Sequence, residues 1–205
     1  MNAQPYKFYF ILMLTNFIAT SSLQSDDVNS KDLAIHHFMQ GEFLLNQGNY
    51  ALAVLEFQDA ISIDPNASTI HVSIADAYRR LGRAKHAENH LKIAIDLDPK
   101  DISSRAMLGQ LYLLSRNYIE AENITSKALS FSEGCARLHY LQASLYFKLK
   151  KYNGAACSIN EAISKSPKEC LFYRLAADIC LALKDNTSAS SYLEKLIDLD
   201  PNDGP

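Results

Sequence analysis

The sequence predicts an all-α protein made of five stacked helix–turn–helix units. An alanine recurs every 34 residues in five successive copies, at Ala53, Ala87, Ala121, Ala155 and Ala189. Within each copy the apolar residues fall into two runs with helical spacing, which are residues 38–45 and 52–63 in the first copy. A strict period of this length indicates an array, because a single hairpin cannot bury its own apolar face and needs stacked neighbours.

Other columns share the 34-residue period and explain how each unit packs. A small residue stands 12 residues before each alanine and lets the two helices of a unit approach closely. In the first copy it is Gly41, and Leu44 and Phe57 fill the space beside it. In the later copies the small residues are Ala75, Gly109, Ala143 and Ala177. Nine residues before each alanine the column holds Leu44, Tyr78, Tyr112, Tyr146 and Cys180.

Each unit has a turn between its two apolar runs and a stop signal after the second run. In the first unit Gly48 and Asn49 form the turn, and Pro65 ends the second helix because proline lacks an N–H and clashes with the preceding turn. Proline recurs at this place in three other copies, at Pro99, Pro167 and Pro201. The third copy lacks it, so there we expect the helix to stop at Gly134.

The pattern of small, aromatic, alanine and proline columns resembles that of the tetratricopeptide repeat family. The resemblance covers roughly residues 34–201 and implies a right-handed α-solenoid. That family often carries tryptophan near the fourth position of its first helix, whereas this chain has no tryptophan. We interpret the residues found there as packing residues that replace an aromatic side chain. They are His37, His71, Arg105, His139 and Tyr173.

The first thirty residues do not belong to the array. Residues 8–19 form an apolar run that follows Lys7 and precedes small residues, an order typical of a secretory signal peptide. The run is short for a membrane span, which needs about 20 apolar residues, so cleavage near Ser21 or Ser22 and an uncleaved anchor both stay open. The predicted segments are 1–22 (signal peptide or anchor), 23–33 (linker), and repeats at 34–67, 68–101, 102–135, 136–169 and 170–203.

The charges around the apolar run predict an exported protein. Lys7 lies before the run and Asp26 and Asp27 lie after it, so an uncleaved anchor would also leave the repeats outside the cytoplasm. We therefore expect a periplasmic or secreted protein, anchored to the inner membrane only if residues 8–19 are retained.

Composition excludes several functional classes. The 205 residues carry a formal net charge of −3 and are 48% hydrophobic, which argues against a disordered chain and against nucleic-acid binding. No glycine-rich phosphate loop, nucleophile elbow or catalytic triad pattern appears in the sequence. We expect no enzyme activity and no cofactor.

Histidine and cysteine spacing gives little support for a metal site. His86 and His90 stand four apart on a predicted helix and could share a metal, but no further ligands are apparent, so we interpret them as a solvated helix face. The four cysteines all lie in the last two copies and their junctions, and an exported location leaves their disulfide state open. They are Cys135, Cys157, Cys170 and Cys180.

The predicted function is protein–protein interaction. In the family that the chain resembles, the first helices of successive repeats line a concave groove, and positions 2, 5, 6, 9, 12 and 13 of each copy share one helical face. Exposed apolar side chains on this face suit an amphipathic helix or an extended segment of a protein partner. The predicted groove residues in the first two copies are Ile35, Phe38, Met39, Glu42, Leu45, Asp76, Arg79 and Arg80. Those in the last three are Met107, Gln110, Leu113, Leu114, Tyr140, Leu141, Ser144, Phe147, Arg174, Leu175 and Asp178.

Two hypotheses about the biological role stay open. The first is a non-catalytic scaffold of the cell envelope, similar to exported tetratricopeptide proteins that act in pilus, secretion or envelope assembly. The second is an N-terminal recognition module of a larger enzyme or export system. No polar capping helix follows Leu193, Leu196 and Ile197, so we also expect possible self-association through the last repeat.

Overall fold

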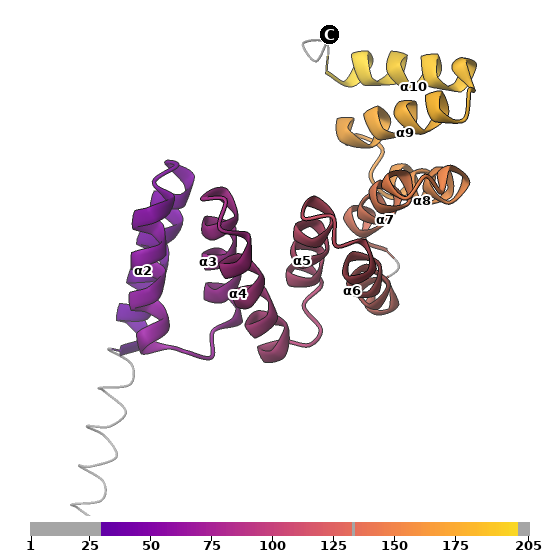
Figure 1. The fold of residues 1–205 in the computed structure, drawn as a ribbon. Coiled ribbons are helices and arrows are strands. Elements are labelled where there is room, and N and C mark those ends of the chain that lie inside the picture. Colours follow the sequence, from indigo (N-terminus) through magenta and orange to yellow (C-terminus); the bar gives the residue numbers. More distant parts are fainter. Residues whose placement is uncertain (1–29, 133, 201–205) are drawn as a thin grey trace, which may run out of the picture. The chain divides into compact units, whose positions relative to one another are not determined.

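The computed structural model describes residues 30–132 and 134–200, which are helical apart from short turns and contain no strand. They form five hairpins (Figure 1), and the first pairs a helix over residues 30–46 with α2. The labelled helices are α2 (Tyr50–Ile63), α3 (Ser68–Arg80), α4 (Ala84–Leu97), α5 (Ile102–Leu114), α6 (Tyr118–Phe131), α7 (Ala136–Lys148), α8 (Tyr152–Lys165), α9 (Cys170–Ala182) and α10 (Asn186–Leu199). The predicted all-α fold of helix–turn–helix repeats is confirmed.

The chain divides into two compact units, Met1–His90 and Leu91–Pro205. In the second unit α5 packs on α6, α7 on α8, and α9 on α10, and each of these pairs is one hairpin (Figure 1). Successive hairpins meet through α6 with α7 and α8 with α9. The first helices also touch, α5 with α7 and α7 with α9, and so form one continuous surface within this unit.

The predicted signal segment over residues 1–22 and most of the linker lie outside the described residues. Within residues 30–132 and 134–200, no helix has both the length and the apolar composition required to cross a membrane.

The hairpin turns all use one residue with a left-handed backbone. This residue is Gly48 or Gly82 in the first two hairpins, with φ of 81° and 71°. In the last three it carries a side chain, at Arg116, Lys150 and Lys184, with φ of 62°, 60° and 64°. At Gly82 the turn is closed by two hydrogen bonds, from Gly82 N to Arg79 O and from Arg83 N to Tyr78 O, and the later turns repeat this arrangement. It is the Schellman motif, which satisfies the last carbonyls of the helix.

The expectation that Gly134 ends the second helix of the third repeat is wrong. Helix α6 ends at Phe131, and its C-cap residue Ser132 has an extended backbone, with φ of −155° and ψ of 98°. The N–H of Ser132 donates to the carbonyl of Ala128, as the N–H of Asp64 donates to Ala60 in the first hairpin. Helices α2 and α6 have the same 14-residue length. The second helix of the third repeat therefore has the same length and the same cap hydrogen bond as that of the first, although proline is missing there.

The recurring small residues lie where the helices of a hairpin come closest. Ala53 and Ala121 have no exposed surface. A Cβ atom placed on Gly41 would lie 2.5 Å from Cε1 of Phe57, a ring that is itself 0% exposed. Position 41 therefore admits only hydrogen as a side chain without a shift of its neighbours, which agrees with the close approach expected from the sequence.

Candidate partner-binding groove

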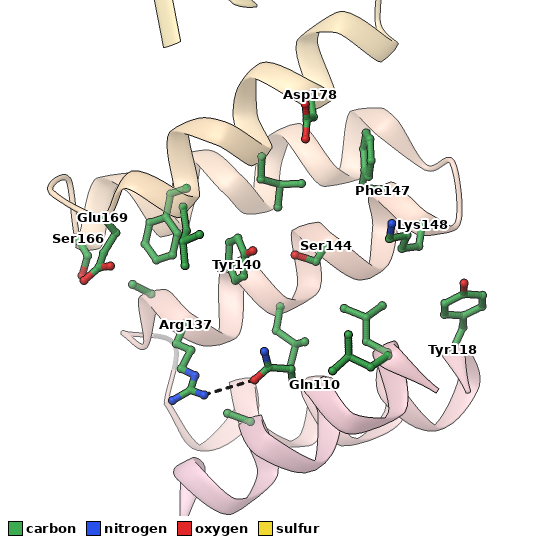
Figure 2. Close-up of a pocket in the computed structure, with 18 of the residues that line it drawn as sticks. Gln110, Tyr118, Arg137, Tyr140, Ser144, Phe147, Lys148, Ser166, Glu169 and Asp178 are labelled. Atoms are coloured by element: carbon green, nitrogen blue, oxygen red, sulfur yellow. Dashed lines mark hydrogen bonds between the residues drawn. The ribbon is translucent and has the colours of Figure 1, made fainter. Parts of the chain in front are cut away.

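An open groove of about 870 Å³ lies along α5, α7 and α9 in the second unit (Figure 2). These are the first helices of three successive hairpins, so the fold itself places them side by side. The lining is largely apolar, and its large apolar and aromatic residues are Leu113, Leu114, Tyr118, Tyr140, Leu141, Phe147, Leu171, Phe172 and Leu175.

Most of the residues predicted for the last three repeats meet in this groove. Nine of the eleven line it, and they are Gln110, Leu113, Leu114, Tyr140, Leu141, Ser144, Phe147, Leu175 and Asp178. Met107 and Arg174 are not among the lining residues. Met107 is half-buried and Arg174 is exposed.

Several lining residues were not predicted. Arg137, Lys148 and Leu171 occupy positions 2 or 13 of their copies, so the helical-face pattern contains the signal for them. Ser166 and Glu169 come from the turn between α8 and α9, and Arg116 comes from the turn after α5. Helical periodicity gives no information on the path of a turn, so these residues could not be found from the pattern.

Two apolar side chains in the groove are strongly exposed. Leu114 is 67% exposed and Leu171 is 54% exposed. Exposed apolar side chains in a concave site are typical of a binding surface, because they cost solvation free energy while they stay uncovered.

Charged groups stand among the apolar residues of the groove. Arg116, Arg137 and Lys148 supply three cations, and Glu169 and Asp178 supply two carboxylates. Figure 2 shows Arg137 directed toward Gln110, whose Oε1 accepts a hydrogen bond from Nη2 of Arg137 at 3.4 Å. Tyr140 and Ser144 also line the groove (Figure 2), and their hydroxyl groups can form hydrogen bonds with the backbone of a bound segment.

The groove residues predicted for the first repeat differ from one another in burial and contacts. Leu45 is only 9% exposed, and the half-buried Phe38 packs on Phe57 with ring centroids 5.9 Å apart, so both act mainly inside the hairpin. Ile35 is 55% exposed and Met39 is 65% exposed, so both can contact a partner. Glu42 accepts a hydrogen bond from the hydroxyl of Ser73 at 2.5 Å.

The charged band predicted in the second repeat is partly neutralised by its own residues. Both Arg79 and Arg80 bind the carboxylate of Asp76, at 2.5 Å and 2.9 Å. Burial by itself would raise the pKa of Asp76, but the hydrogen bonds from Arg79 and Arg80 outweigh it and hold that pKa below its usual value. Two guanidinium groups thus share one carboxylate, which leaves one net positive charge on this face.

The interpretation of His86 and His90 as a solvated face is correct only for His86. His86 is exposed, and its ring packs at a tilt on that of Tyr78 with centroids 5.0 Å apart. His90 is half-buried, and its Nδ1 lies 3.1 Å from Nδ1 of His71. Burial, together with the charges of His71 and His86, lowers the pKa of His90 to about 4, so this ring is neutral at pH 7.

The contact between His71 and His90 belongs to a recurring pair of positions 19 residues apart, one on each helix of a hairpin. In the first hairpin Nδ1 of His37 lies 2.8 Å from Oε2 of Glu56. In the last hairpin the rings of Tyr173 and Tyr192 lie 6.3 Å apart. The structure thus supports the interpretation as packing residues for His71 and Tyr173, whereas His37 makes a polar contact with a carboxylate.

The described residues contain one further cluster of ligand-type groups. Ligand atoms of His37, Glu56 and Asp59 all lie within 4.8 Å of one another. Sequence spacing did not indicate this cluster, because its members come from two helices. The four cysteines are free thiols.

Comparison with known proteins gives the family context. A family profile described as "Tetratricopeptide repeat" matches residues 37–67, 68–101 and 171–203. "Protein O-mannosyl-transferase F38B6.6" of Caenorhabditis elegans is 39% identical over 64 residues, which are 31% of this chain and 9% of that protein. The chain spans between 9% and 28% of the length of the curated relatives that it matches.

Two solved structures share the fold. The structure titled "Functional Characterization of Pseudomonas Aeruginosa pilF" has a TM-score of 0.76 at 16% identity. The superposition covers 83% of this chain and 78% of the pilF chain. YrrB, titled a "TPR protein with an unusual peptide-binding site", has a TM-score of 0.63 at 15% identity and covers 88% of this chain and 93% of its own. At these identities the similarity concerns the fold alone.

Proposed function

Because this chain belongs to the tetratricopeptide repeat family, whose fold serves as a protein–protein interaction scaffold, we propose that it binds a segment of a protein partner in the groove along α5, α7 and α9. The observation that carries the proposal is the groove itself, which combines exposed leucines with three cations and two carboxylates from its helices and their turns. YrrB, a structure of the same fold, is described as having a peptide-binding site, which adds support by analogy.

The groove favours an amphipathic partner segment. Its apolar lining would receive large apolar side chains from an amphipathic helix or an extended segment, spaced so that they fall on one side. Arg137 and Lys148 would pair with acidic residues of the partner. Such rim pairs contribute more to association rate and orientation than to affinity.

The exposed leucines give the size of the expected effect. Leu114 has about two thirds of its surface available to a partner. Full burial of a leucine side chain is worth about 1.5–3 kcal/mol, so the partner gains about 1–2 kcal/mol at this residue. Since 1.4 kcal/mol is a factor of ten in affinity, loss of this contact in a charged variant should weaken binding by about five- to thirtyfold.

Affinity purification from the native source with matched variants tests the groove. Leu114→Asp should lose the co-purifying partner, whereas wild type should retain it. Ile119→Asp is the control, because Ile119 is 81% exposed on α6 and does not line the groove. If Leu114→Asp recovers as much partner as Ile119→Asp, the groove is not the binding surface.

For the location of this scaffold we propose the cell envelope. The support is the apolar run at residues 8–19 with Lys7 before it and Asp26 and Asp27 after it. An alkaline phosphatase fusion, which is active only after export, should be active with residues 1–22 present and inactive without them. Equal activity of the two fusions would contradict export.

A recognition module of a larger enzyme is the second candidate function. The 39% identity to part of a protein O-mannosyl-transferase, of which this chain spans 9%, favours it. In that case the groove would bind the enzyme's protein substrate or a neighbouring domain. Reading the coding sequence beyond Pro205 separates the candidates, because only the module predicts an enzyme domain in the same reading frame.

A further inference from the structure

We propose that His37, Glu56 and Asp59 form a binding site for a divalent transition metal, with Zn²⁺ as the preferred ion. His37 lies in the helix over residues 30–46, and the two carboxylates lie on α2. The site would therefore link the two helices of the first hairpin. It is independent of the groove, which lies in the second unit.

The distances are close to those that zinc requires. Nδ1 of His37 lies 2.8 Å from Oε2 of Glu56, and one ligand atom from each of His37, Glu56 and Asp59 lies within 4.8 Å of the other two. Zinc binds histidine nitrogen at about 2.0–2.1 Å and carboxylate oxygen at about 2.0–2.2 Å, so two tetrahedral ligands stand about 3.3–3.5 Å apart. The His37–Glu56 pair must open by about half an ångström, and Asp59 must move in by a side-chain rotation.

The electrostatics of the cluster favour a cation. Glu56 and Asp59 are three residues apart on one helix, so their negative charges face the same side. In the described part of the chain, no ion pair with lysine or arginine is recorded for either carboxylate, and Glu56 is paired only with His37. A divalent ion bound between His37 and Glu56 would take the place of their hydrogen bond and neutralise both carboxylates.

The ligand set selects the class of metal. One imidazole nitrogen with two carboxylate oxygens suits Zn²⁺, whereas Ca²⁺ and Mg²⁺ prefer sites built entirely from oxygen. Three protein ligands leave one tetrahedral position for water. His37 is 26% exposed and Glu56 is 30% exposed, so the ion can enter from solvent.

The other repeats lack this combination. The second hairpin has His71 and His90 at the paired positions, but Ile93 stands where the first hairpin has Asp59. In the fourth, His139 and Glu161 are present, but Ser158 replaces the glutamate. The paired position can thus be filled by packing residues alone, and the third ligand Asp59 is what distinguishes a metal site from a packing contact.

Isothermal titration of the full chain with zinc chloride tests the site, with the cysteines kept reduced. Wild type should bind one zinc equivalent that His37→Gln abolishes and Asp59→Asn weakens at least tenfold. His139→Gln, at the matching position of the fourth repeat, should bind zinc as wild type does. Zinc bound by the thiols would persist in His37→Gln and Asp59→Asn, because none of the four cysteines lies in the first hairpin.

Two results would overturn the proposal. One is a wild-type chain that binds no zinc, or only zinc that all the variants also bind. The other is an Asp59→Asn variant with wild-type zinc affinity, which would reduce His37 and Glu56 to a packing pair. Asp59 is exposed, so this variant should fold even if His37→Gln does not. Anomalous scattering at the zinc edge from crystals then identifies the ligands directly.

Discussion

Replacement of Gly41 by alanine should destabilise the first hairpin. The added Cβ would lie 2.5 Å from Cε1 and 2.6 Å from Cδ1 of Phe57. Carbon atoms in van der Waals contact are about 3.5–4.0 Å apart, so the overlap is about 1 Å. The ring cannot move aside into solvent, because Phe57 is fully buried.

Two opposing terms set the magnitude for Gly41→Ala. Alanine is better than glycine in a helix interior by about 1 kcal/mol. Overpacking of a tight core costs about 1–3 kcal/mol, and an overlap of this size belongs at the upper end. The net destabilisation should be about 2 kcal/mol, which lowers the melting temperature of a chain of this size by about 4–8 °C.

Gly154→Ala is the matched control. Gly154 lies in the first turn of α8, and an added Cβ would meet Tyr146 at 3.1 Å, a contact that a half-buried ring can relieve. The free energy of unfolding of this variant should therefore lie within about 1 kcal/mol of the wild-type value. Urea unfolding followed by circular dichroism at 222 nm measures both variants. A Gly41→Ala variant as stable as Gly154→Ala would refute the close-packing argument.

Two further predictions concern a turn and a histidine. Lys150 has a left-handed backbone with φ of 60°, which is unfavourable for a residue that carries a Cβ atom. Lys150→Gly should therefore stabilise the chain by up to about 1 kcal/mol in urea unfolding. A loss of stability would contradict this reasoning. The folded pKa of His90, about 4, lies below the ordinary value of 6.5, so its contribution to stability is complete above pH 6.5 and is lost as the pH falls toward 4. The full shift of 2.5 pKa units (6.5 minus 4) is at most about 3.4 kcal/mol, and for a half-exposed ring about 1–2 kcal/mol is expected. Unfolding of wild type and His90→Phe between pH 4 and 7 should show this loss only in wild type, and parallel curves would contradict it.

Part of the groove was predictable and part was not. The helical-face pattern led to Leu114, Tyr140 and Phe147, because residues at fixed helical spacing share a face whatever their neighbours are. The same pattern also selected Leu45, which the structure buries. Periodicity identifies a face, but the depth of each side chain depends on how the next helix packs, and that is a property of the stack.

The cluster of His37, Glu56 and Asp59 and the paired histidines show the same limit. His71 and His90 are 19 residues apart in the chain, and only the hairpin brings their Nδ1 atoms within 3.1 Å. The sequence spacing of His86 and His90 suggested a different pair. The helical interval of four placed both residues on one helix, but the partner of His90 came from the other helix.

The sequence by itself determined the fold, because the 34-residue columns of small, apolar and proline residues encode where two helices touch and where they stop. It also selected one face of each first helix, and nine of the eleven residues selected in the last three repeats line the groove. Tertiary structure alone decided that α6 ends at Phe131, that Arg79 and Arg80 share one carboxylate, and that three first helices enclose a groove. These features depend on distances between residues far apart in the chain, and local sequence preferences carry no information about such distances.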